Sequence, residues 1–525
     1  MKKITVLDSD ILSKMKMRAV KSAIRKLQPE TFIRQCMDYN LQRFKDSLDM
    51  LKHHPWIVNL CIKWAASSIG DKRATKVGDT RTLNKILQQT YDVMPYIPVG
   101  LKSADSIDFF FRNNLYQQLM YQTSSTGHYI SREAFIFGRL DPHHKLSRRF
   151  FELTNLSVER FVMLSITFTF LISSKKNVIK EVTADMFSIL TPYISREEIF
   201  YFLDSLSISY EDLPEFCKRK TTENPLKEYF LPSPFIENPL IKYNDKFLLL
   251  HTQLTLASLQ TFIYDLLRRD DPEKFMDSFG SIFENLVKDI FDESKIRYID
   301  EQSLKKHLPQ ENKVVDFLIP HEAANIFIDA KGVEIHERGM VTLSHSEISG
   351  RIKNSVLKTI EQAHAVNREI LNSPKLITDF KSESYILCIT YKNLMLGNGT
   401  FLEKSYATDG VSKIRKNHDD AYQIPDSHIF CISIEEFEYL MSSCKEHGRQ
   451  PYEVLRYAVE MNRTPSQTVF LFIQHLEKFF GQVTKSEMIR KTGLDLLERM
   501  TENIPGLKQN VNLVNENGGK VATAH

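Results

Sequence analysis

Two short apolar segments in the second half of the chain, at residues 314–319 (VVDFLI) and 325–333 (NIFIDAKGV), constrain the fold more than any other feature. Both are rich in β-branched and aromatic residues, which favour strands. The stretch at 320–322 (PHE) between them is typical of a turn. The sequence therefore predicts a hairpin, which would bring Asp316 and Asp329 side by side at one end of a sheet.

The second of these segments ends in an acid, a spacer and a base. Side chains alternate between the two faces of a strand, so Asp329 and Lys331 are expected on the same face. Asp316 interrupts an apolar strand, where a charge is costly to bury unless it is paired or bound to a metal. Two adjacent carboxylates repel each other, and an oxygen-preferring cation such as Mg²⁺ or Mn²⁺ relieves that repulsion. The pattern predicts a metal site, and the alternative is a structural ion pair at the strand end.

The segments around this pair alternate between helix and strand. Their order predicts a mixed sheet with helices packed on its faces. The expected elements are a helix at 275–293, a short strand at 296–299, a helix at 349–371, strands at 384–390 and 428–434, and a helix at 435–444.

The arrangement of Asp316 followed by Asp329-Ala330-Lys331 resembles the PD-(D/E)xK phosphodiesterase superfamily, whose members are restriction-endonuclease-like. The resemblance implies an α/β nuclease core of the order α-β-β-β-α-β, a mixed sheet flanked by helices, in the C-terminal half of the chain. Members usually have a proline before the first acid, and this chain has Val315 there.

The resemblance also implies an activity, that of a Mg²⁺-dependent endonuclease in which Mn²⁺ can substitute. Glu284, on the preceding helix, corresponds to a further metal ligand of many members, and Gln362, on the following helix, corresponds to a residue near the active site in some. Lys331 would orient the attacking water or stabilise the developing negative charge. The implied catalytic residues are Asp316, Asp329, Lys331, Glu284 and Gln362, and the implied metal ligands are Glu284, Asp316, Asp329 and the Ala330 carbonyl.

The implied partner is a nucleic acid, with DNA favoured over RNA. The net charge of +3 neither demands nor excludes this partner. One alternative is an RNA- or tRNA-cleaving nuclease of the same fold, and another is an inactive nucleic-acid-binding scaffold subunit. A nuclease fused to a large helical region is typical of bacterial antiphage defence proteins, in which the helical region would bind a protein partner or a second copy.

A chain of 525 residues is long enough for several domains. Prolines cluster at 224–239 and indicate a connector, and the polar stretch at the end is expected to be disordered. The expected divisions are a large, mainly α-helical N-terminal region at 1–235, a connector with a hairpin and a helix at 236–272, the nuclease domain at 273–447, a C-terminal helical segment at 448–511, and a disordered tail at 512–525.

The cysteines and the apolar runs indicate the compartment. Six cysteines occur without C-x-x-C spacing, which predicts reduced core thiols. The longest uncharged apolar run, at 161–174, is shorter than the about 20 residues needed to cross a bilayer, so a buried helix is expected there. We therefore expect a cytoplasmic protein without a membrane partner.

Overall fold

The structure, a computed structural model, describes residues 6–97, 105–122, 125–174, 178–222, 224–308, 314–334, 337–342, 344–372, 381, 383–464 and 469–504. Its contacts divide the chain into two compact units. Unit 1 comprises Met1–Pro98, Tyr116–Phe275 and Ile489–His525, and unit 2 comprises Val99–Leu115 and Met276–Met488. Helices α6 (Asp105–Gln118), α15 (Pro272–Ser294) and α25 (Glu487–Asn503) each run through a boundary between the units.

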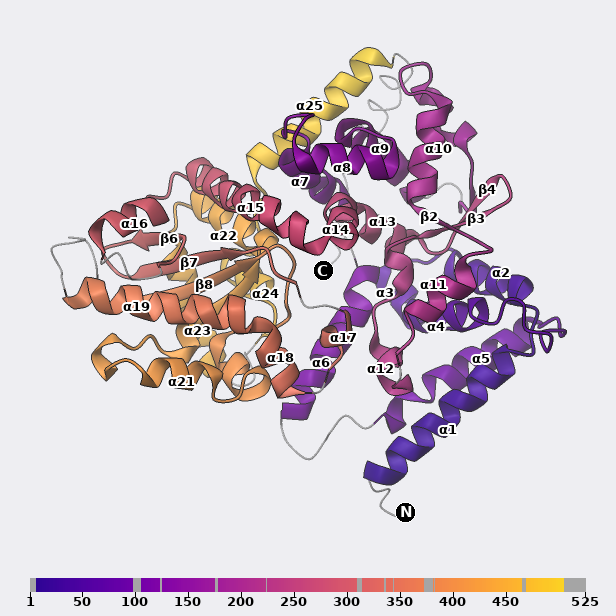
Figure 1. Ribbon diagram of the computed structural model, residues 1–525, viewed down its shortest axis with the longest axis horizontal. Coiled ribbons are helices and arrows are strands. Elements are labelled where there is room, and N and C mark those ends of the chain that lie inside the picture. Colours follow the sequence, from indigo (N-terminus) through magenta and orange to yellow (C-terminus); the bar gives the residue numbers. More distant parts are fainter. Residues whose placement is uncertain are drawn as a thin grey trace. The chain divides into compact units, whose positions relative to one another are not determined.

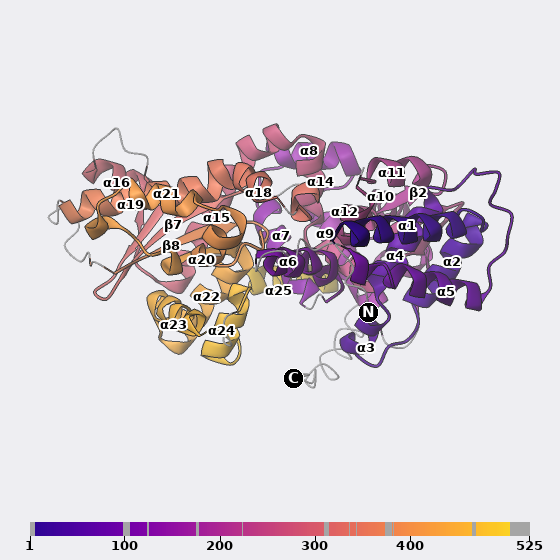
Figure 2. The same cartoon turned by 90° about the horizontal axis from the view of Figure 1, so that it is seen from below.

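Unit 1 is mainly helical, as the sequence predicts, and carries one small sheet (Figures 1 and 2). Its helices besides the three shared ones are α1 (Val6–Ile24), α2 (Pro29–Asn40), α3 (Ser47–Lys52), α4 (Pro55–Ala66), α5 (Thr80–Tyr91), α7 (Thr126–Phe137), α8 (Lys145–Thr154), α9 (Val158–Ser173), α10 (Arg196–Ser205), α11 (Leu213–Arg219), α12 (Pro225–Phe230), α13 (Thr252–Gln260) and α14 (Phe262–Asp270).

The small sheet of unit 1 has the strand order β1-β4-β3-β2. Strands β3 (Leu240–Tyr243) and β4 (Lys246–Leu249) form the hairpin expected in the connector. The sequence did not predict its extension by β1 (Glu181–Val182), which pairs with β4, and by β2 (Ser207–Ser209), which pairs with β3. These two strands are very short, so they show almost no alternation of apolar and polar residues.

The apolar run at 161–174 forms most of α9, and its side chains are largely buried, as predicted. Among the described residues, no single helix is both long and apolar enough to cross a membrane. The pair α8 and α9 reaches that length and composition only together, and it is bent by 56°. The six cysteines are all free and buried, which confirms their interpretation as core thiols.

Two residues at the start of α10 illustrate how local sequence fixes a helix end. The Ser195 hydroxyl accepts a hydrogen bond from the Glu198 N–H at 3.1 Å. The Glu198 carboxylate accepts one from the Ser195 N–H at 2.8 Å. This reciprocal pair is a capping box, and it satisfies two backbone donors that the first helical turn leaves unpaired.

A buried histidine caps α13, and we expect it to make the stability of unit 1 depend on pH. His251 Nδ1 accepts a hydrogen bond from the Leu254 N–H at 3.3 Å at the start of α13, which requires an unprotonated Nδ1. Burial lowers the pKa of His251 to about 3. The unfolded state therefore binds a proton near pH 6.5 that the folded state rejects. The contribution of His251 to the free energy of unfolding is therefore fully present above pH 6.5. It falls by about 1.4 kcal/mol per pH unit between pH 6.5 and 3.

Urea unfolding followed by tryptophan fluorescence at pH 7, 6 and 5 measures this effect in unit 1, because Trp56 and Trp64 are the two tryptophans of the chain. The variant His251→Asn keeps a capping side chain that does not titrate. Its free energy of unfolding should fall less steeply with decreasing pH, and the slope should differ from that of the wild type by about 1.4 kcal/mol per pH unit. An unchanged slope in the variant would assign the pH dependence to other groups.

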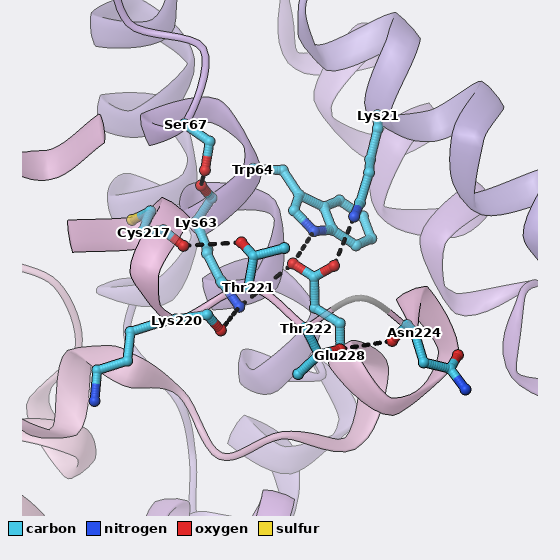
Figure 3. A network of polar contacts seen from close by, with 10 residues as sticks. All are labelled: Lys21, Lys63, Trp64, Ser67, Cys217, Lys220, Thr221, Thr222, Asn224 and Glu228. Atoms are coloured by element: carbon cyan, nitrogen blue, oxygen red, sulfur yellow. Dashed lines mark hydrogen bonds and ion pairs between the residues drawn. The ribbon is translucent and has the colours of Figure 1, made fainter. Parts of the chain in front are cut away.

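A network of buried charges joins distant segments of unit 1 (Figure 3). Glu228 of α12 has a side-chain exposure of 1%, and it accepts hydrogen bonds from Lys21 Nζ at 2.6 Å and from Trp64 Nε1 at 3.0 Å. Lys63 Nζ lies 3.3 Å from the same carboxylate and donates to the Lys220 carbonyl at 2.8 Å. Helices α1, α4 and α12 therefore meet at one carboxylate, and Lys63 also links them to the end of α11.

Unit 2 contains a five-stranded sheet with helices on both faces (Figure 1). Its strands are β5 (Ile299–Asp300), β6 (Phe317–Pro320), β7 (Asn325–Lys331), β8 (Ser384–Thr390) and β9 (Ile429–Ser433), and its helices besides the shared ones are α16 (Glu301–His307), α17 (Glu337–Met340), α18 (His345–Ile352), α19 (Lys358–Asn372), α20 (Gly399–Phe401), α21 (Gly410–Lys416), α22 (Ile434–His447), α23 (Pro451–Arg463) and α24 (Phe472–Phe480).

The strand order of this sheet is β5-β6-β7-β8-β9. Strand β6 is antiparallel to both of its neighbours, β5 and β7, whereas β7, β8 and β9 run parallel. Helix α19 packs on one face, where its apolar residues share a core with Leu318, Phe327 and Ile386. On the other face, Phe291 of α15 contacts Phe317 of β6 and Phe437 of α22. The predicted mixed sheet with flanking helices is confirmed.

Several boundaries in unit 2 differ from the expectations. The strand expected at 296–299 is β5, and the strand expected at 314–319 begins only at Phe317. Helix α16 was not predicted. The helix expected at 349–371 consists of α18, a π-helical turn at Lys353–Leu357, and α19. In the π turn the backbone hydrogen bonds run from i to i+5 over a single turn, and the sequence did not predict this interruption.

A helix from the N-terminal part of the sequence belongs to the core of unit 2. Phe109 of α6 is part of the same hydrophobic cluster as α18 and α19, and its ring makes edge contacts with His345 and Tyr406. Arg112 is fully buried and donates a hydrogen bond to the Met340 carbonyl at 2.8 Å. The compact units therefore divide the chain differently from the sequence-based boundaries.

The C-terminal part of the chain also divides differently. Helices α23 and α24, in the segment expected as separate at 448–511, belong to unit 2. Helix α25 begins in unit 2, where Met488 N–H donates to Glu293 at 2.8 Å, and continues into unit 1. The tail expected at 512–525 lies outside the described residues.

Candidate active site

The hairpin of β6 and β7 brings two acidic residues together. Its register pairs Phe317 with Ile328, so that Asp316, in the bend directly before β6, lies next to Asp329. The Asp316 N–H donates to Asp329 Oδ1 at 3.3 Å, and the Ala330 N–H donates to Asp316 Oδ2 at 2.7 Å. Asp316 was expected inside the strand and instead precedes it, which frees its N–H for the neighbouring carboxylate.

Lys331 completes the group at the end of β7. Its ammonium lies 2.7 Å from Asp329 Oδ2, on the same face of the strand, as alternation predicts. The Asp329 side chain has an exposure of 0%, whereas that of Lys331 is 20% exposed. Asp316 is half-buried. The group is therefore deepest at Asp329, and solvent reaches it at the other two residues.

The electrostatics of the group reflect two carboxylates and a single ammonium. Burial raises the pKa of Asp316 to about 8, and the Asp329 carboxylate adds to the rise, while Lys331 opposes it. Burial alone would lower the pKa of Lys331, but Asp329 and Asp316 outweigh burial and raise it. In the fully ionised state the group carries an excess negative charge in a largely dry environment, which is unfavourable without a cation.

Glu284, the third expected acid, lies in the middle of α15 and is half-buried. Burial raises its pKa, Glu301 raises it further, and Lys331 lowers it. Among the residues that the structure describes, no three or more His, Cys, Asp or Glu side chains lie close enough together to hold a metal ion. The pKa of Glu284 is therefore affected by the charge of Lys331, but Glu284 does not form a three-ligand metal site with the two aspartates.

Gln362 lies on α19, and its amide is buried. Its Nε2 donates to the Val314 carbonyl at 2.8 Å, which holds the segment leading to Asp316. Its Oε1 is buried and receives no hydrogen bond from the part of the chain that is described. Gln362 thus supports the acidic pair through the backbone and presents one unsatisfied acceptor.

A further residue beside the acids was not predicted. Thr359 of α19 donates its hydroxyl to Asp329 Oδ2 at 2.7 Å. Cys388 of β8, in register with Asp329, lies on the same face of the sheet. The sequence held one indication of this residue. Thr359 is a polar side chain three residues before Gln362, next to the apolar positions Ile360 and Ala363 of the same predicted helix.

These residues fit a hard divalent cation in their chemistry. Oδ2 of each aspartate is held by protein donors, and the ligands are the oxygen atoms that Mg²⁺ and Mn²⁺ prefer. A divalent ion would also neutralise the excess charge that raises the pKa of Asp316. Asp316 and Asp329 are the residues that would hold it.

Comparisons with known proteins add no relative: no family model, curated protein or solved structure matches the chain. The interpretation of the site therefore depends on its own residues.

Proposed function

We propose that the chain is a metal-dependent nuclease of the PD-(D/E)xK type that hydrolyses phosphodiester bonds, with DNA as the favoured substrate. The observation that carries the proposal is the hairpin register, which sets Asp316 beside Asp329 with Lys331 on the same face. A strand-end ion pair needs one acid for one base, and this group has a second acid within hydrogen-bonding distance.

Each residue of the group has a role in such a reaction. Asp316 and Asp329 would hold a Mg²⁺ or Mn²⁺ ion, with Glu284 and the Ala330 carbonyl as the further expected ligands. The ion, when bound, supplies polarisation of the phosphate and an activated water. Lys331, kept cationic by both aspartates and reached by solvent, would stabilise negative charge that develops on the phosphate. Gln362 keeps the backbone before Asp316 in place.

A second candidate, an inactive nucleic-acid-binding scaffold, is favoured by one specific observation. Asp329 is fully buried and already accepts hydrogen bonds from three protein groups, those of Lys331, Thr359 and Asp316. A carboxylate satisfied in this way can be stable as part of a structural ion pair. The scaffold would bind nucleic acid in a salt-dependent manner without cutting it.

The full chain, incubated with duplex DNA, single-stranded DNA and tRNA, is expected to produce cleavage products in Mg²⁺ or Mn²⁺. EDTA should abolish the products, because the two aspartates alone cannot activate a water, and added Mg²⁺ should restore them. Gel electrophoresis of all three substrates in parallel measures the activity and separates a DNA nuclease from an RNA nuclease.

Salt-dependent binding without any metal-dependent product, on all three substrates, would favour the scaffold. We further propose that the helical unit 1 senses the target and that this combination of units acts in antiphage defence. Reduced plaque formation on cells that express the wild-type chain, and not on cells that express an uncleaving variant, tests that role.

A further inference from the structure

The hydroxyl of Thr359 is used differently from those of comparable helical residues in this chain. Threonines and serines in helices commonly bond the carbonyl one turn earlier. Here the Thr90 hydroxyl donates to the Ile86 carbonyl at 2.7 Å, and that of Thr154 donates to the Phe150 carbonyl at 2.8 Å. Thr359 instead donates across to the sheet, to Asp329, thirty residues away in sequence.

This bond lies in the dry interior. Thr359 and Asp329 both have an exposure of 0%. Water therefore cannot replace the hydroxyl as a donor to Asp329 Oδ2, and loss of the hydroxyl leaves that oxygen with one donor fewer. The other donor to the same oxygen, Lys331 Nζ, sits at the end of a long flexible side chain and can follow the carboxylate if it turns.

The position of Thr359 is fixed by its own side chain and by the packing of α19. Its β-branched side chain is short and has few rotamers. The helix around it is fixed from two sides: Ile360 and Ala363 belong to the buried core, and Gln362 is bonded to the Val314 carbonyl. Thr359 and Gln362, three residues apart on one helix face, thus hold Asp329 of β7 and the segment that leads to Asp316.

We propose that Thr359 is a positioning residue, which fixes the Asp329 carboxylate with Oδ2 towards α19 and Oδ1 towards Asp316, so that the two acids are preset for one cation. The inference rests on the proposed function. Outer donors of this kind orient the ligands of a metal, and their removal usually weakens metal binding or activity by about 10- to 100-fold.

The test compares Thr359→Val, which keeps the shape and removes the hydroxyl, with Thr359→Ser, which keeps the hydroxyl. Thr90→Val is the matched control, because Thr90 is also a fully buried helical threonine, and its hydrogen bonds to described residues are with Ile86 and Cys61 of unit 1. In the full chain, Mn²⁺ affinity is measured by the electron paramagnetic resonance signal of free Mn²⁺, and kcat and KM are measured on DNA.

We expect Thr359→Val to raise the Kd for Mn²⁺ by about 10- to 100-fold and to lower kcat at fixed Mn²⁺, with little change in KM. Thr359→Ser should recover most of the Mn²⁺ affinity and of kcat, and Thr90→Val should match the wild type.

Equal Mn²⁺ affinity and kcat in the wild type and Thr359→Val would overturn the positioning role but not the nuclease activity. Equal impairment in the Ser and Val variants would overturn it too, since packing rather than the hydroxyl would then matter. A wild-type chain that neither binds Mn²⁺ nor cleaves would reject the proposed function itself.

Discussion

The Asp329→Asn variant of the full chain is expected to cleave DNA in Mg²⁺ about 100- to 1,000-fold more slowly than the wild type, because metal-centred charge stabilisation supplies several kcal/mol of the rate. Asparagine fills the same buried volume and still accepts a hydrogen bond from Thr359. Lys331 keeps Asp316 as a counter-charge. The change therefore removes the ligand charge without opening a cavity, and the initial rate per folded molecule at saturating Mg²⁺ measures its effect.

The matched control is Asp426→Asn. Asp426 forms an ion pair with Arg415 in the same unit, at 2.7 Å and partly buried, so its loss tests the cost of breaking a pair as such. We expect the control to cleave at close to the wild-type rate. Lys331→Met, which removes the ammonium and keeps the apolar stem, should resemble Asp329→Asn. If Asp329→Asn only lowers the melting temperature and cleaves normally while folded, the group is a structural ion pair.

The core of the candidate site could be predicted because it depends on short-range features. The alternation along β7 sets Asp329 and Lys331 on one face, and a tight hairpin sets Asp316 opposite Asp329. Both features are encoded within residues 314–331, so the sequence determines them almost by itself. The start of β6 at Phe317 was missed because two valines before Asp316 favour a strand equally well.

The remaining features depend on partners far away in the chain. The role of Thr359 can be recognised only once the fold shows that its hydroxyl donates to Asp329. Phe109 and Arg112 belong to a helix with no local sign that it completes the core of unit 2. Glu228 lies within the proline cluster at 224–239, which indicates an exposed connector. Burial of each is decided by tertiary contacts, which hydrophobic periodicity does not encode.

Glu228 gives the largest expected effect on stability, about 3–5 kcal/mol for Glu228→Gln. The change leaves Lys63, whose side chain is 2% exposed, without the carboxylate at 3.3 Å (Figure 3). Burial lowers the pKa of Lys63, and Glu228 is the main group that opposes this. The variant must therefore either bury an uncompensated ammonium or deprotonate it, and both cost free energy. Urea unfolding followed by the fluorescence of Trp56 and Trp64 reports this loss in unit 1 alone.

Two further variants separate the buried charge from the loss of hydrogen bonds. Lys63→Met added to Glu228→Gln removes the stranded ammonium, so the double variant should be more stable than Glu228→Gln, since buried ion pairs are often replaced by apolar residues at little cost. Asp204→Asn, which breaks the exposed pair with Lys242 at 2.7 Å, should cost less than about 1 kcal/mol. A double variant no more stable than Glu228→Gln would show that the bonds to Lys21 and Trp64, and not the charge of Lys63, make Glu228 necessary. The sign of that difference decides whether α1, α4 and α12 are held together by charge or by directional bonds.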